Sequence, residues 1–182
     1  TVEEQLSEVV DADIIFGWPS REVFLAAKKL RWIQCPGTGV DKVLSTPELA
    51  DSDVVLTNSR GPHAGPMADH VLGMILWLAH RGHDLYEDQR AHRWEPSRYK
   101  GRMVELAGST MGILALGDIG RAVARRAHGF DMEVYAVDLR PVPSIPEVRE
   151  VWGMERLDEL LGISDWFVVT PPVTAESLGL ID

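Results

Sequence analysis

Two glycines and one aspartate occur at a spacing that could hold a dinucleotide. Gly117 and Gly120 follow the apolar run 111–116, and Asp138 ends a second apolar run, 132–137. Gly117 lets the backbone come close to a pyrophosphate, because a side chain there would fill the space that the phosphate needs. Gly120 allows the following helix to lie tightly on the first strand, and free N–H groups at the start of that helix attract the anion. This order of strand, glycine turn, helix, strand and acid is typical of a dinucleotide-binding β-α-β unit.

The position of Asp138 bears on the choice of cofactor. It lies 21 residues after Gly117, where a carboxylate can accept hydrogen bonds from both ribose hydroxyls of the adenosine. A carboxylate there would repel a 2′-phosphate, so the sequence favours NAD over NADP. Arg140, two residues further on, keeps NADP open as the alternative.

One residue of the turn departs from the fingerprint. The first position is usually glycine, and this chain has Ala115. If that position needs a positive φ, the Cβ costs about 1 kcal/mol or more. If it needs only a small side chain, alanine is nearly neutral. The strand before it, the helix after it and the spacing of Asp138 all favour a nucleotide site over a glycine turn without a ligand.

Composition excludes several classes of protein. The 182 residues are 45% hydrophobic and 25% charged, as in ordinary globular proteins, and the formal net charge is −10. That negative charge opposes a nucleic-acid or acidic-membrane partner. The longest apolar stretch, 71–79, is too short to span a bilayer, and no signal peptide is visible. A single cysteine, Cys35, rules out an internal disulfide, so we expect a core thiol in a protein of the reducing cytoplasm.

Strand and helix patterns alternate along the chain. Apolar periodicity and capping residues predict helices over 1–10, 20–30, 40–44, 66–81, 121–128 and 156–161. Apolar runs predict strands over 12–18 (a buried strand), 31–35, 53–57, 111–116, 132–137, 148–152 and 165–169. Such alternation predicts an α/β fold with parallel sheets.

The middle of the chain differs from both halves. The predicted helix 66–81 is apolar most of the way round, which indicates burial on several sides, between domains or against a partner subunit. We therefore expect a homodimer formed through this helix. Segment 82–101 is polar and aromatic without a regular period, and we interpret it as a connecting arm. The boundary between folding units is expected near Gly65 or near Gly101.

Four stretches resemble one protein family, in the order in which that family has them. They are 32–41, 58–70, 112–120 and 172–181, and together they resemble the D-isomer-specific 2-hydroxyacid dehydrogenases. This group includes glyoxylate/hydroxypyruvate reductases and phosphoglycerate dehydrogenases. The resemblance implies an NAD-dependent oxidoreductase that transfers a hydride between nicotinamide and a small D-2-hydroxy acid or 2-oxo acid.

The resemblance also implies an architecture. Two doubly wound parallel-sheet α/β domains are expected, a flavodoxin-like substrate domain and an NAD-binding Rossmann domain, both incomplete in this chain. The substrate domain would cover 1–65, an interdomain helix and arm 66–100, and the first half of the NAD-binding domain 101–182.

Site residues follow from the same resemblance. Backbone N–H groups of Thr38 and Gly39 would hold the substrate carboxylate, since consecutive N–H groups form an anion-binding concavity. The cofactor would be bound by Gly117, Asp118, Ile119, Gly120, Asp138, Pro171, Pro172, Ser177 and Met67. Besides Ala115, departures from the family pattern are Asp69 in place of glutamate and a second proline at 171–172.

No position matches the family's catalytic arginine, glutamate and histidine, which follow the motif at which this chain ends. We therefore expect an internal segment of a longer enzyme, with the catalytic groups beyond Asp182. Two other functions remain open. One is an NAD-sensing binding protein of the corepressor type, and the other is a Rossmann domain for a flavin or S-adenosylmethionine.

The histidines and tryptophans support plainer interpretations. His80 and His83 lie near one helix end, and His63 and His70 flank its start, but no cysteine or glutamate cluster accompanies them. We expect no metal site there. The tryptophans are expected in packing, with Trp94 of the arm as the one that could touch a ligand or partner; they are Trp18, Trp32, Trp77, Trp94, Trp152 and Trp166.

Overall fold

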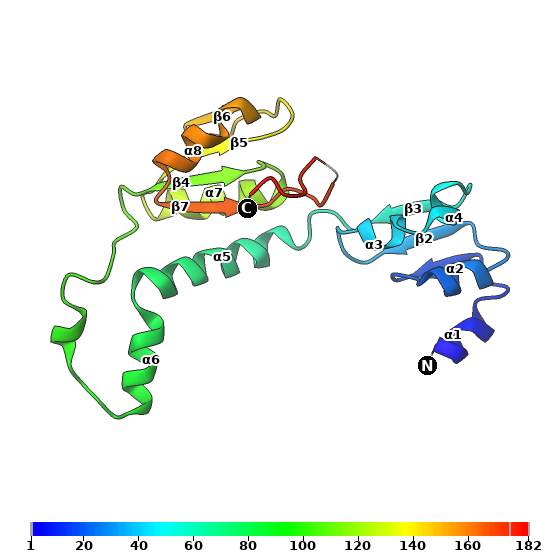
Figure 1. The fold of residues 1–182 in the computed structure, drawn as a ribbon, viewed down its shortest axis with the longest axis horizontal. Coiled ribbons are helices and arrows are strands. Elements are labelled where there is room, and N and C mark those ends of the chain that lie inside the picture. Colours follow the sequence, from blue (N-terminus) through cyan, green and yellow to red (C-terminus); the bar gives the residue numbers. More distant parts are fainter. Residues whose placement is uncertain (1, 175, 182) are drawn as a thin grey trace. The chain divides into compact units, whose positions relative to one another are not determined.

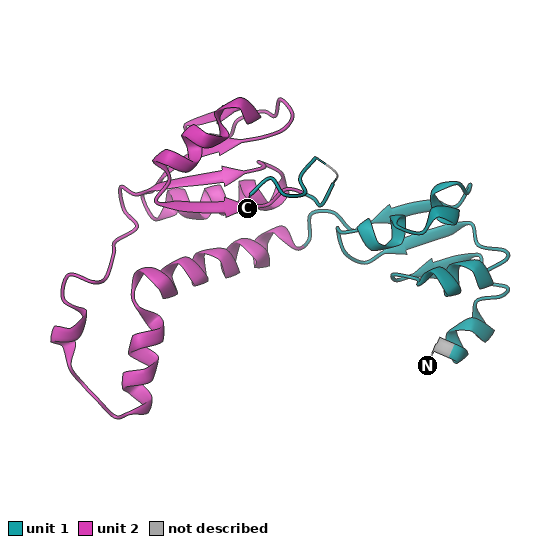
Figure 2. Ribbon diagram, in the orientation of Figure 1, with its two compact units in different colours: residues 1–62, 172–182 teal, residues 63–171 magenta. Residues whose placement is uncertain are grey.

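The chain forms two compact units, each built on a parallel sheet. The computed structural model describes residues 2–174 and 176–181, so Thr1, Ala175 and Asp182 of the sequence patterns lie outside the described residues. Unit 1 comprises residues 1–62 and 172–182, and unit 2 comprises residues 63–171 (Figure 2). The α/β prediction with parallel sheets is confirmed. No helix among the described residues is long and apolar enough to cross a membrane.

Unit 1 has a three-stranded sheet with the order β1-β2-β3 (Figure 1). Its strands are β1 (Ile14–Phe16), β2 (Trp32–Cys35) and β3 (Val55–Asn58). Its helices are short, namely α1 (Val2–Glu8), α2 (Arg21–Ala26), α3 (Asp41–Leu44) and α4 (Pro47–Ala50). Ser20 begins α2 as predicted, because its side chain accepts a hydrogen bond from the N–H of Val23 at 3.3 Å.

The two faces of the unit 1 sheet differ. Ile33 and Cys35 of β2 are fully buried in a small core with residues of α3 and α4. On the alternate face, Ile14, Phe16 and Val55 are 54%, 74% and 57% exposed. The prediction of a buried strand over 12–18 is therefore wrong. Apolar and polar residues do not alternate along this strand, so its sequence does not show which face is buried. In the structure only one face contacts the core.

Unit 2 has a four-stranded sheet with the order β6-β5-β4-β7 (Figure 1). Its strands are β4 (Thr110–Leu114), β5 (Glu133–Val137), β6 (Glu150–Trp152) and β7 (Trp166–Val169). Its helices are α5 (Ala64–Ala79), α6 (Gly82–Arg90), α7 (Asp118–Gly129) and α8 (Leu157–Ile163), with 3₁₀ turns η1 (Pro96–Tyr99) and η2 (Met154–Arg156). Met111 and Ile113 of β4 are fully buried beneath α7, so the predicted β-α-β unit is the centre of the unit 2 core.

Helix α5 packs against α7 through one side. Ala68, Leu72 and Ile75 are buried in the unit 2 core, and Asp69 accepts a hydrogen bond from Arg126 Nε of α7 at 2.5 Å. The opposite side remains open in unit 2, with Leu78 53% exposed. Unit 2 by itself therefore leaves part of this helix uncovered.

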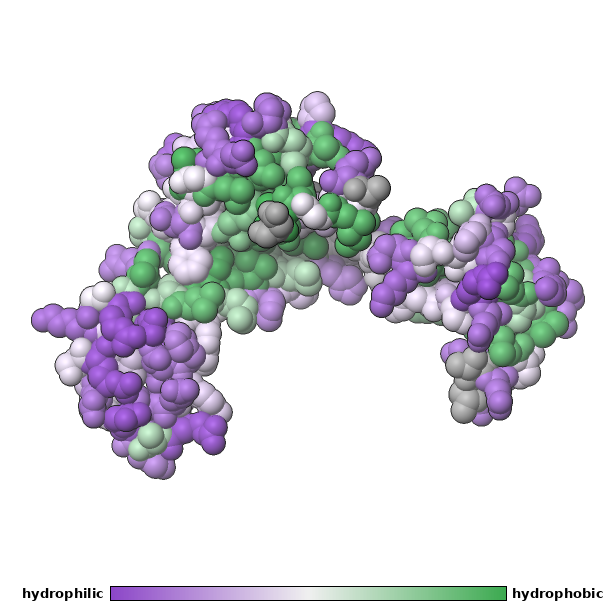
Figure 3. Space-filling model, viewed as in Figure 1, coloured by the Kyte–Doolittle hydropathy of each residue, from purple (hydrophilic) through white to green (hydrophobic). Residues whose placement is uncertain are grey.

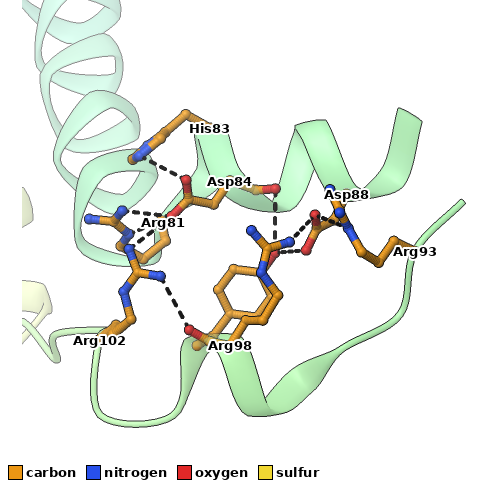
Figure 4. A network of polar contacts seen from close by, with 8 residues as sticks. Arg81, His83, Asp84, Asp88, Arg93, Arg98 and Arg102 are labelled. Atoms are coloured by element: carbon orange, nitrogen blue, oxygen red, sulfur yellow. Dashed lines mark hydrogen bonds and ion pairs between the residues drawn. The ribbon is translucent and has the colours of Figure 1, made fainter. Parts of the chain in front are cut away.

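The arm has regular structure that its sequence did not predict. Helix α6 has nine residues, and η1 follows it. The buried carboxylate of Asp88 joins them by accepting hydrogen bonds from Tyr99 and Arg98 of η1 and from Arg93 Nε at 2.8 Å (Figure 4). The Tyr99 hydroxyl, followed by the two guanidinium groups, holds the pKa of Asp88 below its ordinary value. The surface of the arm is mostly hydrophilic (Figure 3). Ion pairs and hydrogen bonds stabilise α6, and its sequence lacks the apolar periodicity that would predict a helix.

The tryptophans are only partly packing residues. Trp152 is 9% exposed and packs on Tyr135, with ring centroids 5.4 Å apart. In contrast, Trp18, Trp32 and Trp77 are 55%, 39% and 44% exposed, so none of these three belongs to a buried core, although the Trp77 ring lies against Gly82. Trp94 is 88% exposed in the arm.

Candidate functional site

The nucleotide turn, residues 115–117, joins the end of β4 to the start of α7. Ala115 has a φ of +75°, in the left-handed region that favours glycine. Of the two alternatives for this position, the structure shows the one that needs a positive φ. The Cβ of Ala115 therefore carries a conformational cost of about 1 kcal/mol.

The two glycines have different physical roles. A Cβ on Gly120 would lie 2.3 Å from the carbonyl oxygen of Ala115 and 3.2 Å from Ile113, so only glycine lets α7 lie this close to β4. A Cβ on Gly117 would meet no protein atom within 4 Å. The space above Gly117 is therefore open to a ligand, and a side chain would occupy it.

Backbone donors border this open space. The N–H of Arg121 donates to the carbonyl of Gly117 at 2.9 Å, which is the first hydrogen bond of α7. Ile119 and Gly120 precede it, so helix geometry leaves their N–H groups without an acceptor inside the helix. Such groups at the start of a twelve-residue helix are suited to an anion.

The Asp138 carboxylate is turned toward the nucleotide turn. One oxygen accepts a hydrogen bond from the N–H of Leu116 at 2.8 Å, and the other accepts one from the N–H of Arg140 at 3.1 Å. An ionised carboxylate offers about four lone-pair sites, so each oxygen keeps room for one further donor. Two ribose hydroxyls are donors of the right kind.

Two residues that the sequence did not single out support the turn. Thr170, just after β7, donates from Oγ1 to the carbonyl of Ala115 at 2.8 Å. Arg121 of α7 donates from Nε to the carbonyl of Leu116 at 3.1 Å and from Nη2 to the carbonyl of Pro143 at 2.5 Å. Thr170 begins the loop that is expected to border the cofactor, so its position in the sequence could have indicated a role at this turn. No local pattern identified Arg121.

The residues present fit a dinucleotide. The turn offers open space at Gly117, N–H donors ahead of α7 and an oriented carboxylate across the strand ends. A neutral ligand would not need this combination of donors for an anion and an acceptor for hydroxyls.

The substrate loop, residues 36–40, follows β2 in unit 1. The carbonyl of Thr38 accepts a hydrogen bond from Asn58 Nδ2 at 2.7 Å, and the carbonyl of Gly39 accepts one from Trp18 Nε1 at 3.2 Å. Among the described residues, no acceptor is found for the N–H groups of Thr38 and Gly39. The two predicted N–H donors can therefore bind a ligand. The carbonyls of the same two residues already accept hydrogen bonds from Asn58 and Trp18.

The residues predicted to border the nicotinamide lie in both units. Met67 on α5 is 48% exposed, and Pro171 ends unit 2. Pro172 and Ser177 belong to the segment 172–182 of unit 1. The Ser177 hydroxyl donates to the carbonyl of Pro172 at 2.7 Å, which folds this segment back on itself. Their contacts with a cofactor stay a prediction.

Other reactive groups do not form a second centre. In the described part of the chain, no three His, Cys, Asp or Glu residues are grouped so that they could hold a metal ion. Cys35 is a core residue as predicted, and burial raises the pKa of its thiol, which disfavours the reactive thiolate.

Comparison with known proteins identifies the family. Residues 72–182 match the family model of the D-isomer specific 2-hydroxyacid dehydrogenase, NAD binding domain. The chain belongs to the D-isomer-specific 2-hydroxyacid dehydrogenase family. Residues 72–182 carry the family's NAD-binding domain, which fits NAD as the cofactor.

Two curated relatives are D-3-phosphoglycerate dehydrogenases. The protein from Methanocaldococcus jannaschii is 30% identical over 189 residues, which cover 100% of this chain and 35% of the relative. The Homo sapiens protein is 32% identical over 163 residues, which cover 88% of this chain and 30% of the relative. The chain therefore spans about a third of the length of these relatives.

Solved structures show the same fold. The TT0316 protein from Thermus thermophilus is 30% identical with a TM-score of 0.77, over 96% of this chain and 56% of that one. A D-isomer specific 2-hydroxyacid dehydrogenase from Xanthobacter autotrophicus, in complex with NADPH and MES, is 27% identical with a TM-score of 0.77, over 95% of this chain and 53% of that one. The predicted family and fold class are confirmed.

Proposed function

We propose that the full-length protein is an NAD-dependent oxidoreductase acting on a small D-2-hydroxy acid or 2-oxo acid. The observation that carries the proposal is the Asp138 carboxylate, held against the nucleotide turn by the N–H of Leu116 at 2.8 Å. A carboxylate held in this position supports a ribose acceptor and an anion site side by side in unit 2. Membership of an NAD-binding dehydrogenase family supports the same function.

In the proposed complex, the backbone N–H groups of Asp118 and Ile119 bind the pyrophosphate. Gly117 and Gly120 leave the space for it, and Asp138 accepts hydrogen bonds from the adenosine ribose. Bound nicotinamide supplies or accepts the hydride. Met67, Pro171, Pro172 and Ser177 are proposed to border the nicotinamide side.

We propose NAD as the preferred cofactor. The 2′-phosphate of NADP would lie next to the Asp138 carboxylate, and two negative groups at hydrogen-bonding distance repel each other. The Arg140 side chain, exposed just after Asp138, is the feature that would favour NADP. The Xanthobacter relative is a complex with NADPH, which keeps NADP as the alternative cofactor.

The substrate carboxylate is proposed to bind the N–H groups of Thr38 and Gly39. Consecutive N–H groups form a concavity suited to an anion, and here neither is used inside the protein part that the structure describes. From the resemblance to the family, the catalytic arginine, glutamate and histidine are proposed to lie beyond Asp182. In that arrangement the arginine orients the substrate and the histidine transfers the proton.

We also propose that the full-length protein is a homodimer of the cytoplasm. Helix α5 leaves a row of large apolar side chains open on unit 2, with Met74, Trp77 and Leu78 48%, 44% and 53% exposed. A second subunit is the simplest cover for such a row. The single buried thiol of Cys35 suits a reducing compartment. A monomeric mass in light scattering would refute the dimer.

The cofactor site can be tested with two matched glycine variants of α7. Gly117→Ala fills the open space with no protein atom within 4 Å, and the φ of −76° there suits alanine, so stability should stay near wild type. NADH binding, measured by nicotinamide fluorescence of the full-length protein, should weaken at least tenfold. Gly129→Ala at the other end of α7 also meets no atom within 4 Å and should bind NADH as wild type does. Equal binding by both variants would refute the site.

A further inference from the structure

Trp18 occupies an unusual place for a tryptophan. It follows β1 directly after Gly17, whose φ of +146° is open to glycine and strained for other residues. The N–H of Gly17 donates to the carbonyl of Gln34 at 3.0 Å, which ties this bend to β2. The indole is 55% exposed, so the unit 1 core does not explain it.

The indole lies against the substrate loop. A Cβ on Gly37 would come within 3.0 Å of Trp18 Cζ2 and 3.7 Å of Cη2, so the absence of a side chain at position 37 leaves room for the ring. From this position Trp18 Nε1 donates to the carbonyl of Gly39 at 3.2 Å. The ring and its N–H therefore contact the loop at two points.

These contacts fix the direction of the loop's donors. The C=O and N–H of a trans peptide unit lie in one plane and point in opposite directions, and the described chain has no cis peptide bond. When Trp18 holds the carbonyl of Gly39, the N–H of Val40 is directed away from the indole. Asn58 does the same for the preceding unit, by holding the carbonyl of Thr38 and so directing the N–H of Gly39.

The substrate loop is therefore oriented from both neighbouring strands. Trp18 follows β1, Asn58 ends β3, and the loop follows β2 between them. Both side chains donate to carbonyls, which leaves the N–H side of the loop for an anion. Neither contact is local in the sequence, since 21 and 20 residues separate the partners.

We propose that Trp18 is a positioning residue for the substrate carboxylate. It holds the peptide unit that follows Gly39, next to the Gly39 N–H that Asn58 directs, and so keeps this N–H in the direction that the carboxylate needs. The inference rests on the proposed function, because it assumes that this loop receives the substrate. It predicts that loss of the indole N–H weakens carboxylate binding without disturbing the nucleotide site.

The test compares two tryptophan variants of the full-length protein. Trp18→Phe keeps an aromatic ring near Gly37 and removes the N–H donor to Gly39. Trp32→Phe is the control, because Trp32 Nε1 donates to Thr57 Oγ1 at 2.7 Å on the same sheet and makes no hydrogen bond to the loop itself. With glyoxylate or hydroxypyruvate as substrate, Trp18→Phe should raise KM about 3- to 10-fold, as expected for one lost hydrogen bond, with kcat nearly unchanged.

Further measurements separate positioning from a general structural effect. The dissociation constant of oxamate, a carboxylate inhibitor, should rise by the same factor in Trp18→Phe, while that of NADH and the melting temperature should not change. Gly37→Ala is a second variant, because its methyl group would displace the ring and should raise the same KM. Trp32→Phe should behave as wild type throughout.

The outcomes distinguish the two proposals. An active wild-type enzyme whose KM and oxamate binding are unaffected by Trp18→Phe overturns the positioning role alone. The positioning role is also overturned if Trp18→Phe raises the dissociation constant of NADH, or if Trp32→Phe raises KM as much as Trp18→Phe does, because the effect would then be general. A full-length protein that neither reduces 2-oxo acids nor binds oxamate overturns the proposed function, and the inference with it.

Discussion

The nucleotide turn of unit 2 and the substrate loop of unit 1 are built on the same plan. Each follows a strand that has a parallel neighbour on both sides, β4 between β5 and β7, and β2 between β1 and β3. Each is held by a side chain from either neighbour. Asp138 and Thr170 hold the nucleotide turn, while Trp18 and Asn58 hold the substrate loop.

The two loops differ in what fixes them. The nucleotide turn leads into a twelve-residue helix whose Gly120 lies on the backbone of the turn, above fully buried residues of β4. The substrate loop leads into the four-residue α3, beside a sheet with one open face. Close packing therefore fixes the first loop, and individual hydrogen bonds fix the second. The first should be sensitive to added volume and the second to the loss of a single donor.

The largest expected effect is that of added volume at Gly120. Gly120→Ala would place a methyl group 2.3 Å from the carbonyl oxygen of Ala115, which is backbone and cannot move aside freely. Overpacking of this kind should lower the free energy of unfolding by about 3 kcal/mol. Urea denaturation of the full-length protein measures it. Gly129→Ala at the end of the same helix is the control and should remain within about 1 kcal/mol of wild type. Two equally stable variants would show that packing does not fix the nucleotide turn.

The next effect separates the charge of Asp138 from its hydrogen bond to the turn. Asp138→Asn keeps an oxygen that can accept from the N–H of Leu116 and loses only the exposed contact with the N–H of Arg140, so the free energy of unfolding should fall by about 1 kcal/mol or less. The amide is a weaker acceptor for ribose hydroxyls, so NADH binding should weaken about tenfold, and the preference over NADPH should narrow. Fluorescence titration with both cofactors measures the two constants. Asp131→Asn, an exposed control in unit 2, should leave both unchanged. If Asp138→Asn binds NADH as wild type does, the ribose assignment is wrong.

The comparison also explains what the sequence could predict. The nucleotide turn is encoded within a few residues, because glycine spacing, the helix start and Asp138 act through local geometry and one adjacent strand. The sequence does not determine the φ of Ala115, because residue type alone does not set this angle. The structure shows the positive value of +75°.

The substrate loop could be located only by family resemblance. Its supports, Trp18 and Asn58, lie on other strands, and no spacing rule connects a tryptophan with a carbonyl 21 residues away. The arm was missed for a similar reason. Its helix is held by the carboxylate of Asp88 and the partners around it, so it has no apolar period to indicate a helix.

A smaller effect is expected from the β3 side of the substrate loop. Asn58→Ala removes the donor to the carbonyl of Thr38, an exposed contact of 2.7 Å, and should cost about 1 kcal/mol or less. Amide hydrogen exchange in the loop should become faster, which is easier to detect than the loss of stability. The loop then keeps only the hydrogen bond from Trp18 of the two that orient it. Ser45→Ala is the control, because its hydroxyl donates only locally, to the carbonyl of Lys42 at 2.7 Å. Unchanged exchange in Asn58→Ala would mean that the loop is rigid without its neighbours.

The smallest effect concerns the strain at Ala115, and it has the opposite sign. Ala115→Gly removes a Cβ from a residue with a φ of +75°, which relieves about 1 kcal/mol, but glycine also makes the unfolded chain more flexible. The two terms partly cancel, so the free energy of unfolding should rise by up to about 1 kcal/mol. Ala124→Gly, in the fully buried middle of α7, should instead lower it by about 1 kcal/mol. If both variants lose stability alike, Ala115 is not strained. Glycine at this position of the fingerprint would then serve only the close approach of the cofactor.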